Sequence, residues 1–114
     1  MNLNFLKNKK ILVTGGTGSI GSALTLKLIK SNCNVIRVMS NDENGLYEFS
    51  KKINRTFPVN YNIFENQMNK NRIRFFLGDV RDLTRCREVT KDVDIVIHAA
   101  ALKHVNIAEY NPNE

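Results

Sequence analysis

The sequence TGGTGSIG occupies residues 14–21, between a short apolar run and a segment with helical periodicity. The run before it, KKILV at residues 9–13, suits a strand that is buried on both faces. After it, apolar residues recur with helical spacing between positions 20 and 29, and Ser31-Asn32 ends the pattern. A strand, a glycine-rich turn and a helix in this order are typical of the first unit of a nucleotide-binding sheet.

The three spaced glycines of this segment each have a physical role. Gly15 permits the tight turn, Gly18 lets the backbone approach a pyrophosphate, and Gly21 lets the helix pack closely on the sheet. The start of the helix then presents unpaired N–H groups and the positive end of its dipole to the phosphates. The motif therefore predicts dinucleotide binding, and an ordinary glycine turn is the alternative.

The remaining chain continues the alternation of strands and helices. Strands are predicted at residues 35–39, 73–77 and 94–98, helices at 42–54 and 82–90, and a connecting loop at 59–71. Alternation of this kind predicts parallel pairing with right-handed crossovers. We expect the α/β class and a Rossmann-like, doubly wound parallel sheet. The sheet would be incomplete, with about four strands in the order 3-2-1-4.

Composition excludes several functions. The 17 Lys and Arg exceed the 11 Asp and Glu, but they are dispersed among acids, so no nucleic-acid partner is predicted. The chain has no apolar run near the roughly 18 residues that span a bilayer, so we expect no membrane association. Cys33 and Cys86 form no ligand-like cluster, which predicts no metal site and favours a reducing cytoplasm.

The residues after the second predicted strand bear on the choice of dinucleotide. An acid there, roughly 20 residues past the glycines, selects NAD, whereas a small residue with a nearby Arg accommodates the 2′-phosphate of NADP. Ser40 leaves room for a phosphate, but Asn41 supplies no charge before Asp42. Arg37 comes two residues too early and points off the strand. These residues leave the choice open.

Three segments resemble one protein family. They are TGGTGSIG, FFLGDVRDLTR at residues 75–85, and DVDIVIHAAALKHVNIAEYNPNE at residues 92–114. Together they resemble the extended short-chain dehydrogenase/reductase superfamily, and more narrowly its polysaccharide-biosynthesis branch, the UDP-N-acetylglucosamine 4,6-dehydratases, some of them inverting. HAAALKHV followed by EYNP is the more specific part. The resemblance covers almost the whole chain except residues 44–71.

The resemblance implies a set of cofactor contacts. Gly15 and Gly21 belong to the set as motif glycines, and the pyrophosphate would be contacted by Thr17, Gly18, Ser19 and Ile20. The adenosine ribose would be contacted by Ser40, Asn41 and Asp42, and the adenine by Asp79 and Val80. Ala99 would lie at the central ribose-phosphate region, and Lys103 would reach toward the nicotinamide and the sugar nucleotide. The alternatives are that Asp79 caps the helix near Asp82 and that Lys103 is solvated. His98 is expected to be a packed core residue.

The cofactor implied by the resemblance is NADP, with NAD possible. Asn41 stands where many family members carry Arg, and Gly45 where a Lys often lies. The implied enzyme is a cytoplasmic, homo-oligomeric lyase that acts on a UDP-sugar for surface polysaccharide or glycan precursor biosynthesis. It oxidises carbon 4 of UDP-N-acetylglucosamine, eliminates water across carbons 5 and 6, and returns the hydride to carbon 6.

No catalytic residue is expected within the 114 residues. The family's catalytic pair is a Tyr with a Lys four residues later, after the fifth strand. Tyr47 and Lys51 have this spacing but follow the second strand, beside the adenosine end, so we interpret the match as chance. Residues 1–114 are then the N-terminal part of a dinucleotide-binding domain, inactive alone, with the sugar-nucleotide-binding part outside them. The alternatives are a nucleotide-sugar epimerase and a non-catalytic dinucleotide-binding module.

Overall fold

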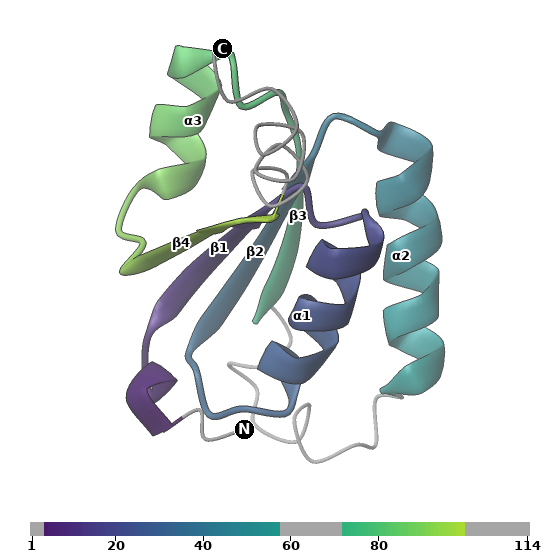
Figure 1. Ribbon diagram of the computed structural model, residues 1–114, viewed down its shortest axis with the longest axis vertical. Coiled ribbons are helices and arrows are strands. Elements are labelled where there is room, and N and C mark those ends of the chain that lie inside the picture. The colour runs from purple at the N-terminus through teal and green to yellow at the C-terminus, as the bar shows by residue number, and fades with distance from the viewer. Residues whose placement is uncertain (1–3, 58–71, 100–114) are drawn as a thin grey trace, which may run out of the picture.

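The computed structural model describes residues 4–57 and 72–99 of the chain. These residues form one parallel sheet with helices on both faces (Figure 1). Its strands are β1 (Lys10–Thr14), β2 (Val35–Ser40), β3 (Ile73–Leu77) and β4 (Ile95–His98), and the helices are the 3-10 turn η1 (Asn4–Leu6), α1 (Ser19–Ile29), α2 (Glu43–Thr56) and α3 (Leu83–Thr90). The strand order β3-β2-β1-β4 confirms the prediction, and the predicted bounds agree to within two residues.

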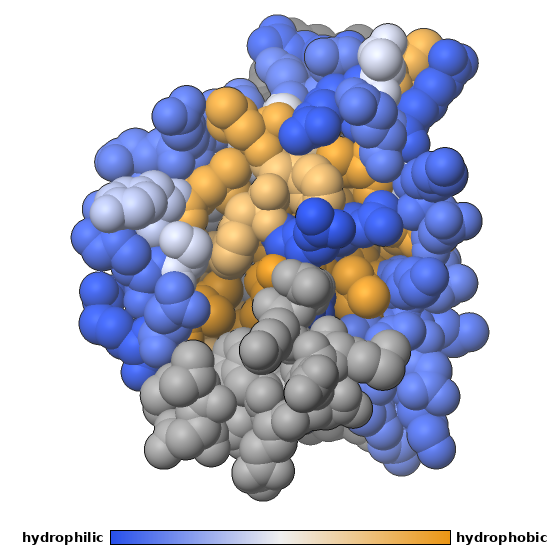
Figure 2. Space-filling view, turned by 180° about the vertical axis from the view of Figure 1, so that it is seen from behind, coloured by the Kyte–Doolittle hydropathy of each residue, from blue (hydrophilic) through white to orange (hydrophobic). Residues whose placement is uncertain are grey.

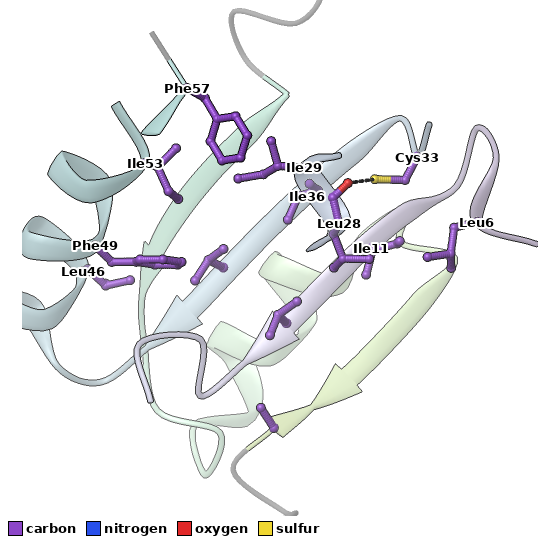
Figure 3. Packing of buried hydrophobic residues seen from close by; sticks show 13 residues of the cluster. Leu6, Ile11, Leu28, Ile29, Cys33, Ile36, Leu46, Phe49, Ile53 and Phe57 are labelled. Carbon is purple, nitrogen blue, oxygen red and sulfur yellow. Dashed lines mark hydrogen bonds between the residues drawn. The ribbon is translucent and has the colours of Figure 1, made fainter. Parts of the chain in front are cut away.

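The main core lies between the sheet and helices α1 and α2. Alternate strand residues enter it, because successive side chains of a strand face opposite sides. Ile11, Val13, Ile36 and Val38 are all buried there, and Figure 3 labels Ile11 and Ile36 among the packed side chains. Phe49 of α2 meets Phe75 of β3 edge to face, with ring centroids 6.2 Å apart. This packing fixes both helices against the strands whose carboxyl ends form the site.

The opposite face of the sheet is covered less completely. A smaller cluster of Leu12, Met39 and Val89 joins it to α3. Arg37 crosses this face and donates hydrogen bonds of 2.8 Å to the carbonyls of Val89 and Lys91, at the end of α3. Apolar surface remains visible on this side of the molecule (Figure 2). Within the described residues, no helix is long and apolar enough to cross a membrane.

The carboxyl end of α1 is held by an arginine that the sequence patterns do not single out. Arg72, just before β3, is 5% exposed. Its guanidinium donates to the carbonyls of Ile29 at 2.8 Å, Ser31 at 2.7 Å and Cys33 at 3.1 Å. A cation is favoured here, because the last carbonyls of a helix carry the negative end of its dipole. Arg72 therefore joins α1 and the loop after it to the start of β3.

We predict that Arg72→Met destabilises the protein, since the buried carbonyls of Ile29 and Cys33 lose their Arg72 donor. Hydrogen bonds from a charged group and buried unsatisfied carbonyls together imply a loss of about 2–4 kcal/mol. Urea denaturation measures the loss, and Arg74→Met, at an exposed position of β3, is the matched control. Equal stability of the two variants would contradict this role for Arg72.

Candidate functional site

The turn after β1 is built on backbone geometry that requires glycine. Gly15 has φ 68°, in the left-handed region that other residues seldom adopt. The Gly18 N–H closes the turn on the Gly15 carbonyl at 3.2 Å. The Gly16 N–H donates to the Met39 carbonyl, also at 3.2 Å, and so ties the turn to the end of β2. The tight turn predicted at Gly15 is confirmed.

Helix α1 lies directly against this turn. A Cβ atom at Gly21 would lie 2.8 Å from Gly16 Cα and even closer to the Gly15 carbonyl oxygen. The close approach predicted for Gly21 is therefore present, but its partner is the turn backbone and not the sheet. The glycine spacing of the motif gives Gly16 no role. A Cβ there would overlap the Val38 side chain, a contact between segments that no local pattern reveals.

The first turn of α1 borders an open cleft. Gly18 is the N-cap of α1 and makes no side-chain cap, so the helix start presents backbone rather than a capping side chain. The cleft has a volume of about 290 Å³ and lies at the carboxyl ends of β1 and β2. Its lining consists of Gly15, Thr17, Gly18, Ile20, Gly21, Ser40, Asn41, Asp42 and Ala99. The structure thus brings together the residues predicted for the pyrophosphate and the ribose, except Ser19.

Ser40 connects the loops that border the cleft. It is 6% exposed, and its hydroxyl lies 2.9 Å from the Thr17 hydroxyl. The same oxygen accepts the N–H of Asp42 at 3.0 Å. The backbone carbonyl of Ser40 accepts the N–H of Gly78 at 2.9 Å. One residue at the end of β2 therefore fixes the glycine turn, the start of α2 and the loop after β3.

A second, smaller hollow of about 80 Å³ adjoins the cleft. Three of its lining residues, Gly15, Ser40 and Asn41, also line the cleft, and Met39, Gly78, Asp79 and Val80 complete it. The family resemblance implies the adenine at Asp79 and Val80, and both residues line this hollow together with the predicted ribose residues Ser40 and Asn41. Their binding roles stay predictions, as does that of Lys103, which lies outside the described residues.

Asp79 is engaged by a neighbouring arginine. Its carboxylate accepts the Arg81 backbone N–H at 2.8 Å and lies 2.7 Å from the Arg81 guanidinium. The side-chain hydrogen bond to Arg81, reinforced by the backbone one, lowers the pKa of Asp79 to about 2. The alternative that Asp79 caps the following helix is wrong. Asp82 is the N-cap of α3 and accepts the N–H of Arg85 at 3.1 Å.

Two other expectations concern residues outside the cleft lining. His98 was expected to be packed, but it is exposed, because the alternation of β4 places it with Val96 on the thinly covered face. Its Nδ1 forms a hydrogen bond with the Thr14 hydroxyl. Tyr47 is 61% exposed, and the Lys51 ammonium lies 4.9 Å from its ring centroid. Neither Tyr47 nor Lys51 lines the cleft, which agrees with a chance match.

Comparisons with known proteins place the chain beside nucleotide-sugar enzymes. The family model described as "Polysaccharide biosynthesis protein" matches residues 11–114. A UDP-N-acetylglucosamine 4,6-dehydratase (inverting) of Campylobacter jejuni is 46% identical over 93% of the chain, and a UDP-glucose 4-epimerase of Rickettsia bellii is 34% identical over 94%. The chain spans 28% of the length of each of these relatives.

The described fold also has solved counterparts. The X-ray structure of Pen from Bacillus thuringiensis superposes with a TM-score of 0.69 and 31% identity, over 95% of this chain and 30% of that one. The Bordetella bronchiseptica enzyme WbmF, solved in complex with NAD+ and UDP, has a TM-score of 0.55 at 21% identity, over 85% of this chain and 24% of that one. At 21% identity, the comparison with WbmF shows a similar fold only.

We predict that the Asp79 carboxyl titrates near pH 2 in the folded protein, below its ordinary value of 3.8. The folded pKa is the lower one, so any stability from the Asp79–Arg81 pair is present above about pH 4 and is lost as the pH falls toward 2. Carboxyl NMR shifts measure the midpoint. Arg81→Gln should return it toward 3.8, and an unchanged midpoint in that variant would exclude the Arg81 guanidinium as the cause.

Proposed function

The chain belongs to the polysaccharide biosynthesis protein family, and from this premise we propose that it is the cofactor-binding part of a nucleotide-sugar 4,6-dehydratase. The proposed substrate is UDP-N-acetylglucosamine, and the product would feed surface polysaccharide or glycan precursor synthesis. We propose residues 1–114 as the N-terminal part of a dinucleotide-binding domain. The sugar-nucleotide-binding part and the catalytic Tyr/Lys pair would then lie outside them.

One observation carries the cofactor proposal. The glycine turn places the uncapped first turn of α1 over a cleft at the carboxyl ends of parallel strands. The cleft adjoins the point where the strand order reverses, between β1 and β4. Open α/β sheets bind ligands in such crevices, and helix N-termini attract phosphates. The residues present therefore fit a dinucleotide.

Each part of the cleft has a proposed task. The backbone from Thr17 to Ile20 would bind the pyrophosphate, residues 40–42 the adenosine ribose, and the hollow beside Asp79 the adenine. A nicotinamide dinucleotide bound in this way supplies a reversible hydride acceptor for the sugar. The resemblance favours NADP and leaves NAD possible, and the WbmF structure holds NAD+.

The dehydratase is preferred to the epimerase on sequence identity. Over nearly equal shares of this chain, the identity is 46% to the Campylobacter jejuni dehydratase and 34% to the Rickettsia bellii epimerase. A dinucleotide-binding module without chemistry remains the third possibility. Because nucleotide sugars and nicotinamide cofactors are cytoplasmic metabolites, the cytoplasm is the proposed setting. The homo-oligomer stays a prediction from resemblance.

We predict that Gly18→Val in the full-length protein abolishes dinucleotide binding, since a branched side chain would occupy the space where backbone must meet phosphate. Calorimetric titration with the dinucleotide measures the loss. Tyr47→Phe is the control. It should keep both binding and activity, and loss of activity in that variant would mean that the Tyr47–Lys51 match is catalytic after all.

The reaction class can be tested on the full-length protein with UDP-N-acetylglucosamine. The proposal predicts a 4-keto-6-deoxy sugar nucleotide, one water lighter than the substrate, by mass spectrometry and NMR. A product of unchanged mass with inverted carbon 4 would establish the epimerase instead. Binding of the dinucleotide without turnover of the UDP-sugar would favour the non-catalytic module.

A further inference from the structure

We infer that the adenosine-ribose end of the cleft is built to exclude a 2′-phosphate, so that the cofactor is NAD and not NADP. This inference rests on the proposed dinucleotide binding and specifies its ligand. It departs from the family resemblance, which favours NADP. The residues that carry it are Asn41, Asp42 and Gly45, at the junction of β2 and α2.

The charge at this end of the cleft is negative. Among the described residues that line the cleft, Asp42 is the only one with a charged side chain. Its carboxylate accepts the Gly45 N–H at 2.9 Å and caps α2, which is a favourable place for an anion. The Asp42 carboxylate thereby occupies the positive N-terminal end of α2, where a phosphate could otherwise bind. A 2′-phosphate would meet a carboxylate instead of a cation.

The polar groups beside Asp42 are suited to hydroxyls. Asn41 is exposed and neutral, so its amide can exchange hydrogen bonds with ribose hydroxyls but cannot balance a phosphate. The Ser40 hydroxyl is already bonded to Thr17 and to the Asp42 N–H. It therefore has little capacity left for the several acceptor oxygens of a phosphate.

Gly45 prevents the start of α2 from supplying a cation of its own. A Cβ atom at this position would lie 2.5 Å from Asp42 Oδ2 and 3.2 Å from Thr17 Cβ. A lysine side chain could enter here only if the Asp42 cap and Thr17 moved. The glycine and the capping carboxylate are therefore parts of one arrangement, in which the start of α2 supplies no cation to balance a phosphate.

The arginines near the cleft already have partners. Arg37 binds the carbonyls at the end of α3 on the other face of the sheet. Arg81 is paired with Asp79, and Arg85 donates to the Leu77 carbonyl.

Two further cations of α2 also lie away from the ribose end. Lys52 and Arg55 line a separate groove that shares Thr17 and Gly45 with the ribose end and also contains Glu48. They follow Gly45 by two and nearly three helical turns, about 10 and 15 Å along the axis. Within the part of the chain that the structure describes, no cation replaces the charge that Asn41 lacks.

The test compares NAD with NADP by calorimetric titration of the full-length protein, and AMP with adenosine 2′,5′-bisphosphate as probes of the adenosine end alone. We expect NAD and AMP to bind at least about tenfold more tightly than their 2′-phosphorylated forms, as one unbalanced charge at contact distance implies. Equal or tighter binding of NADP would overturn the inference while leaving the proposed function intact. If neither dinucleotide binds, the proposed function fails as well.

Two variants locate the discrimination. Asn41→Arg should tighten NADP by about tenfold and leave NAD nearly unchanged, since it adds one cation at the ribose. Asp42→Asn removes the charge but keeps an oxygen that can cap α2. It should therefore reduce the preference in affinity for NAD over NADP without unfolding the helix. Lys52→Ala is the control and should change neither affinity. If both Asn41→Arg and Asp42→Asn leave the ratio unchanged, or if Lys52→Ala selectively weakens NADP, the inference is wrong.

Discussion

The close approach between helix α1 and the turn that precedes it controls the rest of the site. It exists because position 21 has no side chain, which lets α1 rest on the Gly15 and Gly16 backbone. With a larger residue there, the helix would move away from the turn. The N-cap at Gly18 and the cleft beneath it would move as well, since Gly18 and Ile20 line that cleft. The absence of a Cβ atom at Gly21 thus determines where the uncapped start of α1 lies over the sheet edge.

The hydrogen bonds of Ser40 extend this arrangement to the other loops. Its hydroxyl joins Thr17 to the Asp42 amide, and its carbonyl joins the loop after β3. The ribose end and the adjoining hollow are therefore held in register by one buried residue. The acids on either side of it differ in their partners. Asp79 pairs with an arginine, whereas the Asp42 carboxylate caps α2 and has no ion pair within the described residues.

Much of this fold could be predicted from the sequence because its determinants are local. Apolar runs, helical spacing and the glycine motif identify the elements between residues 10 and 98, and the alternation of strands and helices implies the parallel order. The failures concern contacts between distant segments. The overlap of Gly16 with Val38 and the binding of Arg72 by the end of α1 require two chain segments to be placed in space first. The exposure of His98 depends on how much of one sheet face is covered. None of these is written in a spacing pattern.

The crowding at Gly45 constrains how this ribose end could change over generations of substitutions. A lysine at position 45 is blocked by the Asp42 carboxylate and by Thr17, whereas position 41 is exposed and accepts a long side chain freely. The effect of a lysine at position 45 therefore depends on whether Asp42 has already been replaced by a smaller residue. Positions 42 and 45 are therefore epistatic, and a path toward a phosphorylated ribose is open at residue 41 before it is open at residue 45.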